Sequence, residues 1–244
     1  MTRTPLRAPA PDAGEVAAFA SARAAVLDRI ARACARARRP PTDVQLLAVS
    51  KTVPVDRLRA AVAGGLEQLG ENRVQDAVAK FREVPGVRWH LVGPLQSNKA
   101  RRAVELFETI QTVDSVGLAR RLAALSAELG RSPLRVLVQV NVDADPAKAG
   151  FRPADVQAAL TELASLGDLR IEGLMTVGRM TTDPEDARPT FRALSELSRS
   201  LRGRDAGLGH ELSMGMSDDF DVAIEEGATI VRIGRALFGE RPPG

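Results

Sequence analysis

The chain has 244 residues, a net charge of only +3, and 44% hydrophobic and 27% charged residues. This length and composition fit one large domain with a buried core. No apolar run approaches the roughly 20 residues that a membrane-spanning helix needs, so we expect no membrane association. Cys34 is the only cysteine, which excludes an internal disulfide and leads us to expect a cytoplasmic protein.

The N-terminal segment, residues 1–14, is rich in proline and alanine and lacks the apolar centre of a signal peptide. We interpret it as a flexible tail ahead of a single domain over residues 15–244. The first predicted element is a helix over Glu15–Arg39, whose arginine-rich end we interpret as a solvated face. A nucleic-acid-binding module is the alternative. With 3% aromatic residues and no tyrosine, however, the chain has little to stack on bases, so we expect no nucleic-acid partner.

After this helix, short β-rich runs alternate with segments of helical periodicity such as the one that follows Asp114-Ser115. The predicted strands are Gln45–Ser50, Leu66–Gly70, Arg88–Gly93, Thr109–Val113, Arg135–Asn141, Arg170–Thr176, Glu211–Met214 and Thr229–Gly234. This alternation predicts an α/β fold, a single (β/α)8 (TIM) barrel with one extra N-terminal helix. A doubly wound parallel sheet is the alternative, but no G-x-G-x-x-G follows the first strand.

Polar side chains and glycines gather at the ends of the predicted strands, which is where barrels of this kind place their active sites. The candidate binding residues there are Lys51, Asn72, Lys148, Met175, Ser213, Ser217, Arg232, Gly234 and Arg235. Metal binding is not expected, because His90 and His210 have no neighbouring ligand at metal-site spacing.

Lysine is rare in this chain: only Lys51, Lys80, Lys99 and Lys148 occur among 34 basic residues. A lysine that persists in such an arginine-rich sequence is a candidate for chemistry that arginine cannot perform, such as condensing with an aldehyde. Lys51 directly follows the apolar run Leu46–Val49, where burial would lower the pKa of its amine. Lys99 lies in a polar context, and Lys148 lies in a loop that we expect to be mobile.

The loops after the seventh and eighth predicted strands are candidates for a phosphate site, as in other barrels. Ser217 offers a hydroxyl, and Gly234 and Arg235 offer backbone N–H groups, with Ser213 nearby. The alternative is an ordinary capped loop. Arg232 lies within an apolar strand and therefore needs a partner, which would be a phosphate, a pyridine nitrogen or an acidic neighbour.

Six stretches that span most of the chain form a recognisable pattern: LLAVSKTVP (46–54), LGENRVQD (69–76), WHLVGPLQSNK (89–99), the VNVD…KAGF stretch (140–151), GLMTV (173–177) and LSMGMSDDFDVAIEEGATIVRIGRALFG (212–239). They closely resemble the YggS/PROSC family of pyridoxal 5′-phosphate (PLP) homeostasis proteins. The resemblance implies a barrel like the N-terminal domain of alanine racemases, with PLP held as a Schiff base on Lys51. It also implies that LSMGMS and VRIG hold the phosphate and that Arg232 approaches the pyridine nitrogen.

The resemblance further implies a PLP carrier or regulator without robust turnover, so no catalytic residue is assigned. Its expected partners are PLP itself and PLP-dependent apoenzymes, and we expect a monomer. The chain departs from the family pattern at Arg73, where a tyrosine is frequent, and at Ala149. The main alternative is a PLP-dependent racemase-like enzyme, which would need a tyrosine and a second domain. A lysine Schiff-base aldolase without a cofactor is a further alternative.

Overall fold

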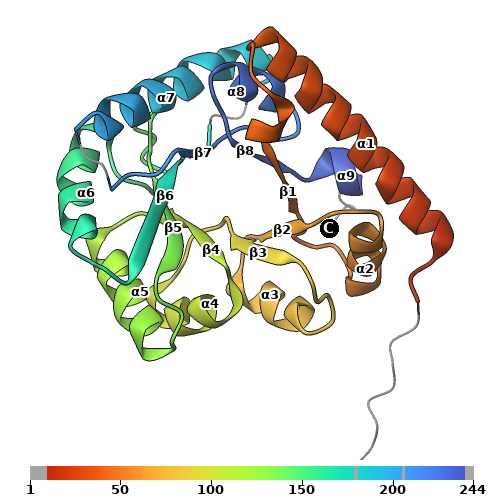
Figure 1. The fold of residues 1–244 in the computed structure, drawn as a ribbon, viewed down its shortest axis with the longest axis horizontal. Coiled ribbons are helices and arrows are strands. Elements are labelled where there is room, and N and C mark those ends of the chain that lie inside the picture. Colours follow the sequence, from red (N-terminus) through yellow and green to blue (C-terminus); the bar gives the residue numbers. More distant parts are fainter. Residues whose placement is uncertain (1–9, 179–180, 205–206, 240–244) are drawn as a thin grey trace, which may run out of the picture.

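The computed structural model of the protein describes residues 10–178, 181–204 and 207–239. These residues form a closed barrel of parallel strands in sequence order, with helices around the outside (Figure 1). The last strand closes onto the first through neighbouring pairs from Gln45↔Ile230 to Ala48↔Ile233. The predicted (β/α)8 barrel is confirmed, and the open, doubly wound alternative was wrong.

All the predicted strands are present, with small differences at their ends. The strands are β1 (Gln45–Val49), β2 (Gln68–Glu71), β3 (Arg88–Leu91), β4 (Thr109–Val113), β5 (Leu134–Gln139), β6 (Leu169–Met175), β7 (Glu211–Ser213) and β8 (Ile230–Ile233). The second strand starts later than predicted because the Leu66 N–H donates to the Ala61 carbonyl, which closes the end of the preceding helix.

The helices cover the outer face of the barrel. They are α1 (Ala13–Arg36), α2 (Val55–Ala63), α3 (Val74–Phe81), α4 (Ala100–Leu106), α5 (Val116–Glu128), α6 (Val156–Ala164), α7 (Arg188–Arg202), α8 (Phe220–Glu225) and α9 (Arg235–Phe238), with short 3-10 turns η1 (Pro41–Asp43), η2 (Ser97–Lys99), η3 (Pro153–Asp155) and η4 (Pro184–Ala187). The start of α5 is as predicted, since the Ser115 side chain accepts a hydrogen bond from the Leu118 N–H.

The extra N-terminal helix, α1, is confirmed and lies along the outside of α8, α9 and α2 (Figure 1). It begins at Ala13, because the Asp12 side chain accepts from the Glu15 N–H at 2.9 Å. It ends at Arg36, before the Arg39 that the sequence suggested, because Arg38 has a φ of +53° that a helix cannot contain. Residues 13 and 14, expected in the tail, therefore belong to the helix. Of the rest of the predicted tail, residues 10–12 precede the helix, with Asp12 as its cap, and residues 1–9 lie outside the described residues.

The apolar core has two parts. The larger part fills the space between the strands and the helices, while a smaller cluster of Leu47, Leu137, Met175 and Ile230 fills the barrel interior. Side chains thus close the centre of the barrel, which leaves the loops at the strand ends to form a site. Among the described residues, no helix is both long and apolar enough to cross a bilayer.

Candidate functional site at the carboxyl ends of the strands

The barrel brings the loops after its strands to one rim, because all the strands are parallel. Lys51 follows β1, Asn72 follows β2, Lys148 follows β5, and Ser217 and Gly234 follow β7 and β8. β1 pairs with both β2 and β8, so Lys51 is flanked by the loops that carry Asn72 and Gly234. The candidate lysine and the candidate phosphate loop are therefore neighbours at this rim.

The candidate lysines differ in their contacts more than in their burial. Lys51, Lys99 and Lys148 are all half-buried. The Lys148 Nζ donates to the carbonyls of Val177 and Gly178, at 3.3 and 3.1 Å, and lies 3.6 Å from Asp145 Oδ2. These contacts place its amine against the loop after β6, and the mobility expected of Lys148 stays a prediction.

Arg232 lies inside the barrel, where the structure supplies the partners that the sequence required. Its side chain donates from Nη1 to Ser213 Oγ and from Nη2 to the Thr176 carbonyl, both at 2.8 Å. Burial lowers the pKa of Arg232 to about 10, and nearby Asp219 opposes this effect. The guanidinium therefore remains charged at neutral pH. Ser213 is fully buried and accepts from this arginine, and its place near a phosphate stays a prediction.

The hydrogen bonds continue from Ser213 to residues that the sequence reasoning did not select. Ser213 Oγ donates to Gln111 Oε1 at 2.6 Å, and Gln111 Nε2 lies 3.0 Å from His90 Nδ1. Burial lowers the pKa of His90 to about 3, with Arg135 and Arg88 adding to the shift. Gln111 stands between Ile110 and Thr112 on β4, and the amide side chain within this predicted β-rich run was the available signal.

The loop after β7 is shaped by a glycine and an aspartate. Gly215 has a φ of +88°, and a Cβ there would lie 2.6 Å from the Ala223 Cβ, so only glycine fits. Asp219 Oδ1 accepts from the Met216 N–H at 2.6 Å. Burial raises the pKa of Asp219, and the bond from Met216 partly offsets that rise.

This loop meets the start of α9 at the candidate phosphate site. The Gly234 N–H donates to Ser217 Oγ at 3.3 Å. A Cβ on Gly234 would meet no atom nearer than the Val49 carbonyl oxygen, at 3.6 Å. The Arg235 side chain is exposed and pairs with Asp218, which leaves its backbone N–H as the group to consider for phosphate.

Met175 and Asn72 complete the predicted set and differ in accessibility. Met175 has no exposed surface and packs in the interior cluster. Its contact with a ligand remains a prediction that requires the side chain to become accessible. Asn72 is half-buried at the rim. Arg73, where the family often has tyrosine, is exposed and precedes α3.

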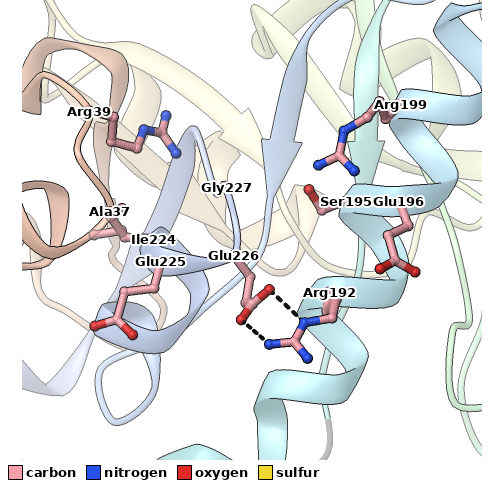
Figure 2. A pocket seen from close by; sticks show the side chains of 10 residues that line it. All are labelled: Ala37, Arg39, Arg192, Ser195, Glu196, Arg199, Ile224, Glu225, Glu226 and Gly227. Carbon is pink, nitrogen blue, oxygen red and sulfur yellow. Dashed lines mark hydrogen bonds and ion pairs between the residues drawn. The ribbon is translucent and has the colours of Figure 1, made fainter.

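A cavity of about 390 Å³ lies away from this rim, between α7 and the ends of α1 and α8 (Figure 2). None of the predicted binding residues lines it, and one wall is the ion pair of Arg192 with Glu226 at 2.9 Å. The cavity is therefore separate from the candidate site. Within the described part of the chain, no group of three or more histidine, cysteine or acidic side chains could hold a metal.

Comparison with known proteins defines the class of barrel. The family described as alanine racemase, N-terminal domain, matches residues 23–242. An alanine racemase of Clostridium difficile is similar in fold, with a TM-score of 0.66 and 17% identity over 88% of this chain and 57% of the racemase. The fold is thus the racemase barrel.

Relatives of higher identity define the family. A pyridoxal phosphate homeostasis protein of Pseudomonas aeruginosa is 43% identical over 91% of this chain and 95% of its own length. The one of Aquifex aeolicus is 41% identical over 88% and 95%. PipY of Synechococcus elongatus, solved with PLP bound, is 43% identical, covers 88% of this chain and 100% of its own, and has a TM-score of 0.76. This chain belongs to the family of pyridoxal phosphate homeostasis proteins, which confirms the resemblance seen in the sequence.

The residues at the rim fit a PLP molecule in their chemistry. A phosphate needs N–H and hydroxyl donors, which Gly234, Arg235 and Ser217 carry. An aldehyde needs a primary amine, which Lys51 carries. Gly234 has no side chain, and a Cβ there would make only ordinary contacts with Val49, at 3.6 Å or more, so its backbone is not crowded by neighbouring protein atoms.

Proposed function

We propose that this protein binds PLP as a Schiff base on Lys51 and maintains PLP supply without robust catalytic turnover. When bound, PLP supplies an aldehyde that condenses with a primary amine with loss of one water molecule. The observation that carries the proposal is the position of Lys51, which follows β1 and is flanked by the loop holding Gly234. The names of the relatives and the PLP-bound structure of PipY support the choice of ligand.

Ser217 and the backbone N–H groups of Gly234 and Arg235 are proposed to hold the phosphate. Ser213 supports this loop indirectly, through Arg232. Arg232 is proposed to face the pyridine nitrogen, where its buried positive charge keeps that nitrogen unprotonated. Asn72, Met175 and Lys148 complete the proposed binding set, with Lys148 at the edge where PLP would enter or leave.

The test is to load the purified protein with PLP, record its visible spectrum, reduce it with borohydride and map the labelled peptide. The label is expected on Lys51. Lys51→Ala and Lys51→Arg should abolish both the visible band and the label, because a guanidinium forms no stable imine. Lys99→Ala is the matched control, outside the proposed binding set, and should retain both. A label on Lys99 or Lys148 in the unmutated protein would contradict the assignment.

The biological setting of the proposed activity is the cytoplasm, with a monomeric protein that exchanges PLP with PLP-dependent apoenzymes. An exchange experiment tests this directly. PLP-loaded protein is mixed with a PLP-free apoenzyme, and the recovery of enzyme activity is compared with that produced by an equal amount of free PLP. Sedimentation analysis of the loaded protein tests the monomer.

A further inference from the structure

Lys80 lies outside the proposed PLP site and is the most deeply buried of the four lysines. It lies on α3 behind β2, and its side chain is 9% exposed. A buried ammonium is costly unless it is paired and hydrogen-bonded. Its contacts therefore show what the structure gains from placing a lysine there.

The hydrogen bonds of the Lys80 amine lead to Ser50, which lies between the end of β1 and Lys51. The Lys80 Nζ donates to Glu71 Oε1 at 2.7 Å and to the Ser50 carbonyl at 2.8 Å. Ser50 Oγ also donates to Glu71 Oε1, at 2.7 Å. The ion pair thus holds Ser50, the residue before Lys51, through both its carbonyl and its hydroxyl.

The Ser50 carbonyl belongs to the peptide unit that joins Ser50 to Lys51. The same oxygen accepts from the Val53 N–H at 3.1 Å, which closes a tight turn over residues 50–53. Within this turn Thr52 has a φ of +67°, a conformation that a β-branched residue adopts only when the surroundings enforce it. The hydrogen bond from Lys80 to the Ser50 carbonyl helps to hold the turn in this conformation.

A buried ion pair is weak evidence of a role in stability, because an apolar pair of similar volume often stabilises the fold equally well. Glu71 illustrates the cost: it is fully buried, and its Oε2 has no hydrogen-bond partner among the described residues. The Glu71–Lys80 pair leaves one carboxylate oxygen unsatisfied close to Lys51. We therefore explain the pair by the backbone geometry that it imposes on the turn before Lys51.

We propose that Glu71 and Lys80 form a positioning pair that sets the orientation of Lys51 for imine formation with PLP. The inference rests on the proposed function and deepens it. Neither residue reacts with PLP. They act through Ser50: the compact ammonium of Lys80 carries three donors on one nitrogen and bonds both the Glu71 carboxylate and the Ser50 carbonyl.

The decisive comparison is between PLP and 4′-deoxypyridoxine 5′-phosphate, which has the ring and phosphate but no aldehyde. In the double variant Glu71→Leu/Lys80→Met, the buried charges are removed together, so the barrel is expected to fold. Affinity for PLP should fall about tenfold, the equivalent of losing one hydrogen bond to a charged group. Affinity for the deoxy analogue should stay within about twofold, a difference of under ~0.5 kcal/mol.

Ser50→Ala provides a second variant with a smaller change, which removes one bond to Glu71 and leaves the ion pair in place. It should lower PLP affinity by about threefold to tenfold, in line with one hydrogen bond, and leave the analogue unaffected. Glu172→Gln is the matched control, because Glu172 is a buried carboxylate paired with Arg135 on another part of the barrel. It should change neither affinity.

Unchanged PLP affinity in Ser50→Ala or in the folded double variant would overturn the proposal. An equal loss for both ligands would also overturn it, since that result indicates general damage to the pocket. These outcomes are separate from a failure of the proposed function, in which unmutated protein would form no imine on Lys51 at all.

Discussion

At the scale of single residues, the hydrogen bonds from Arg232 into the barrel run in one direction. An arginine can only donate, so Ser213 must accept from Arg232 and use its own proton to bond Gln111 Oε1. The Gln111 amide nitrogen then faces His90 Nδ1 as a donor. His90 is therefore assigned as the neutral tautomer that carries its proton on Nε2. One buried charge fixes the state of a histidine that lies three hydrogen bonds away.

A pH prediction follows for His90. Burial lowers its pKa from 6.5 to about 3, so between these values the unfolded chain binds a proton that the folded chain excludes. The contribution of the neutral ring to stability is complete above pH 6.5 and is lost as pH falls towards 3. The slope is up to about 1.4 kcal/mol per pH unit. Denaturant unfolding of unmutated protein and His90→Gln over this range should show a smaller slope in the variant. Equal slopes, or an NMR titration of His90 near its ordinary pKa, would contradict the assignment.

Gly234 allows the proposed phosphate contact to be tested without disturbing the fold. Its φ is −110°, and a Cβ would lie 3.6 Å from its nearest neighbour, so Gly234→Val should fold. We expect its PLP affinity to fall by tenfold or more, about 1.4 kcal/mol, while its affinity for pyridoxal, which lacks the phosphate, changes less. Gly117→Val is the control, because a Cβ there meets nothing within 4 Å and the position lies on α5. Equal losses for both ligands would indicate that the loop is only structural.

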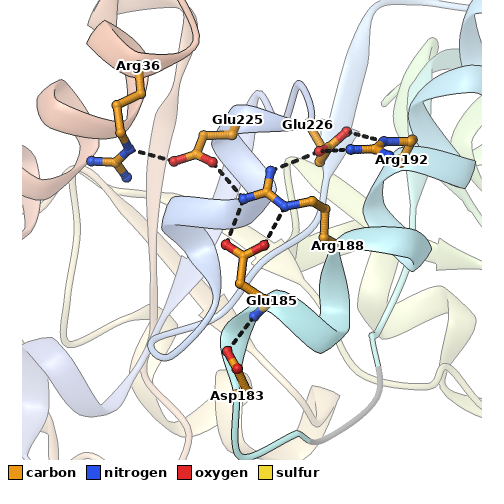
Figure 3. Close-up of polar contacts among 7 residues, drawn as sticks. All are labelled: Arg36, Asp183, Glu185, Arg188, Arg192, Glu225 and Glu226. Carbon is orange, nitrogen blue, oxygen red and sulfur yellow. Dashed lines mark hydrogen bonds and ion pairs between the residues drawn. The ribbon is translucent and has the colours of Figure 1, made fainter.

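At the scale of secondary-structure elements, one arginine joins α7 to α8 and η4 (Figure 3). Arg188 forms ion pairs with Glu185, Glu225 and Glu226 at 2.6, 2.8 and 2.9 Å. Hydrogen bonds to these carboxylates raise the pKa of Arg188, most strongly through Glu185. For Glu225, burial acts to raise the pKa, but the bonds from Arg188 and Arg36 outweigh it, and the pKa is lowered.

Arg188→Gln should therefore destabilise the protein, because it leaves three neighbouring carboxylates without their shared cation. We expect a loss of about 2 kcal/mol in the free energy of unfolding. A lowered carboxylate pKa gives stability that is complete above the unfolded value of 4.5 and is lost as pH falls through the folded value. The difference in unfolding free energy between unmutated protein and variant should thus shrink on acidification.

Arg120→Gln is the control. It breaks the exposed pair with Glu162 and should cost under about 1 kcal/mol. Similar losses in both variants, or a difference that grows at low pH, would refute this.

The elements themselves were predictable from the sequence because their signals are local. Apolar runs mark the strands, and a cap such as Ser115 marks the start of a helix. The position of Lys51 at the rim follows from strand order alone. The hydrogen bonds around Arg232 were not predictable in this way. Thr176 lies 56 residues from Arg232, and Gln111 lies 102 residues from Ser213, so these groups meet only once the barrel closes. The contacts of Lys148 involve likewise the carbonyls of the loop after β6, about 30 residues along the chain.

At the scale of the whole molecule, the barrel is shared with racemases, so the fold by itself does not decide between carrier and enzyme. What distinguishes a racemase from a carrier is the set of side chains that the barrel places at the site. Racemisation needs a second proton-transferring group opposite the lysine, and the sequence contains no tyrosine to supply one. Proton transfer by a positioned side chain contributes roughly 10²–10⁴-fold to a rate, so its loss would be severe.

We therefore predict that the PLP-loaded protein does not racemise amino acids efficiently. Arg232 adds a second reason: its pKa of about 10 keeps it cationic at neutral pH, and a cation at the pyridine nitrogen disfavours the protonation that makes the ring an electron sink. The measurement is the rate at which loaded protein interconverts the enantiomers of alanine and of serine, beside an alanine racemase under the same conditions. A turnover near the enzyme median of about 10 s⁻¹ would contradict the prediction. Turnover gained in Arg232→Gln, with the imine on Lys51 intact, would show that this charge restrains a site otherwise able to react.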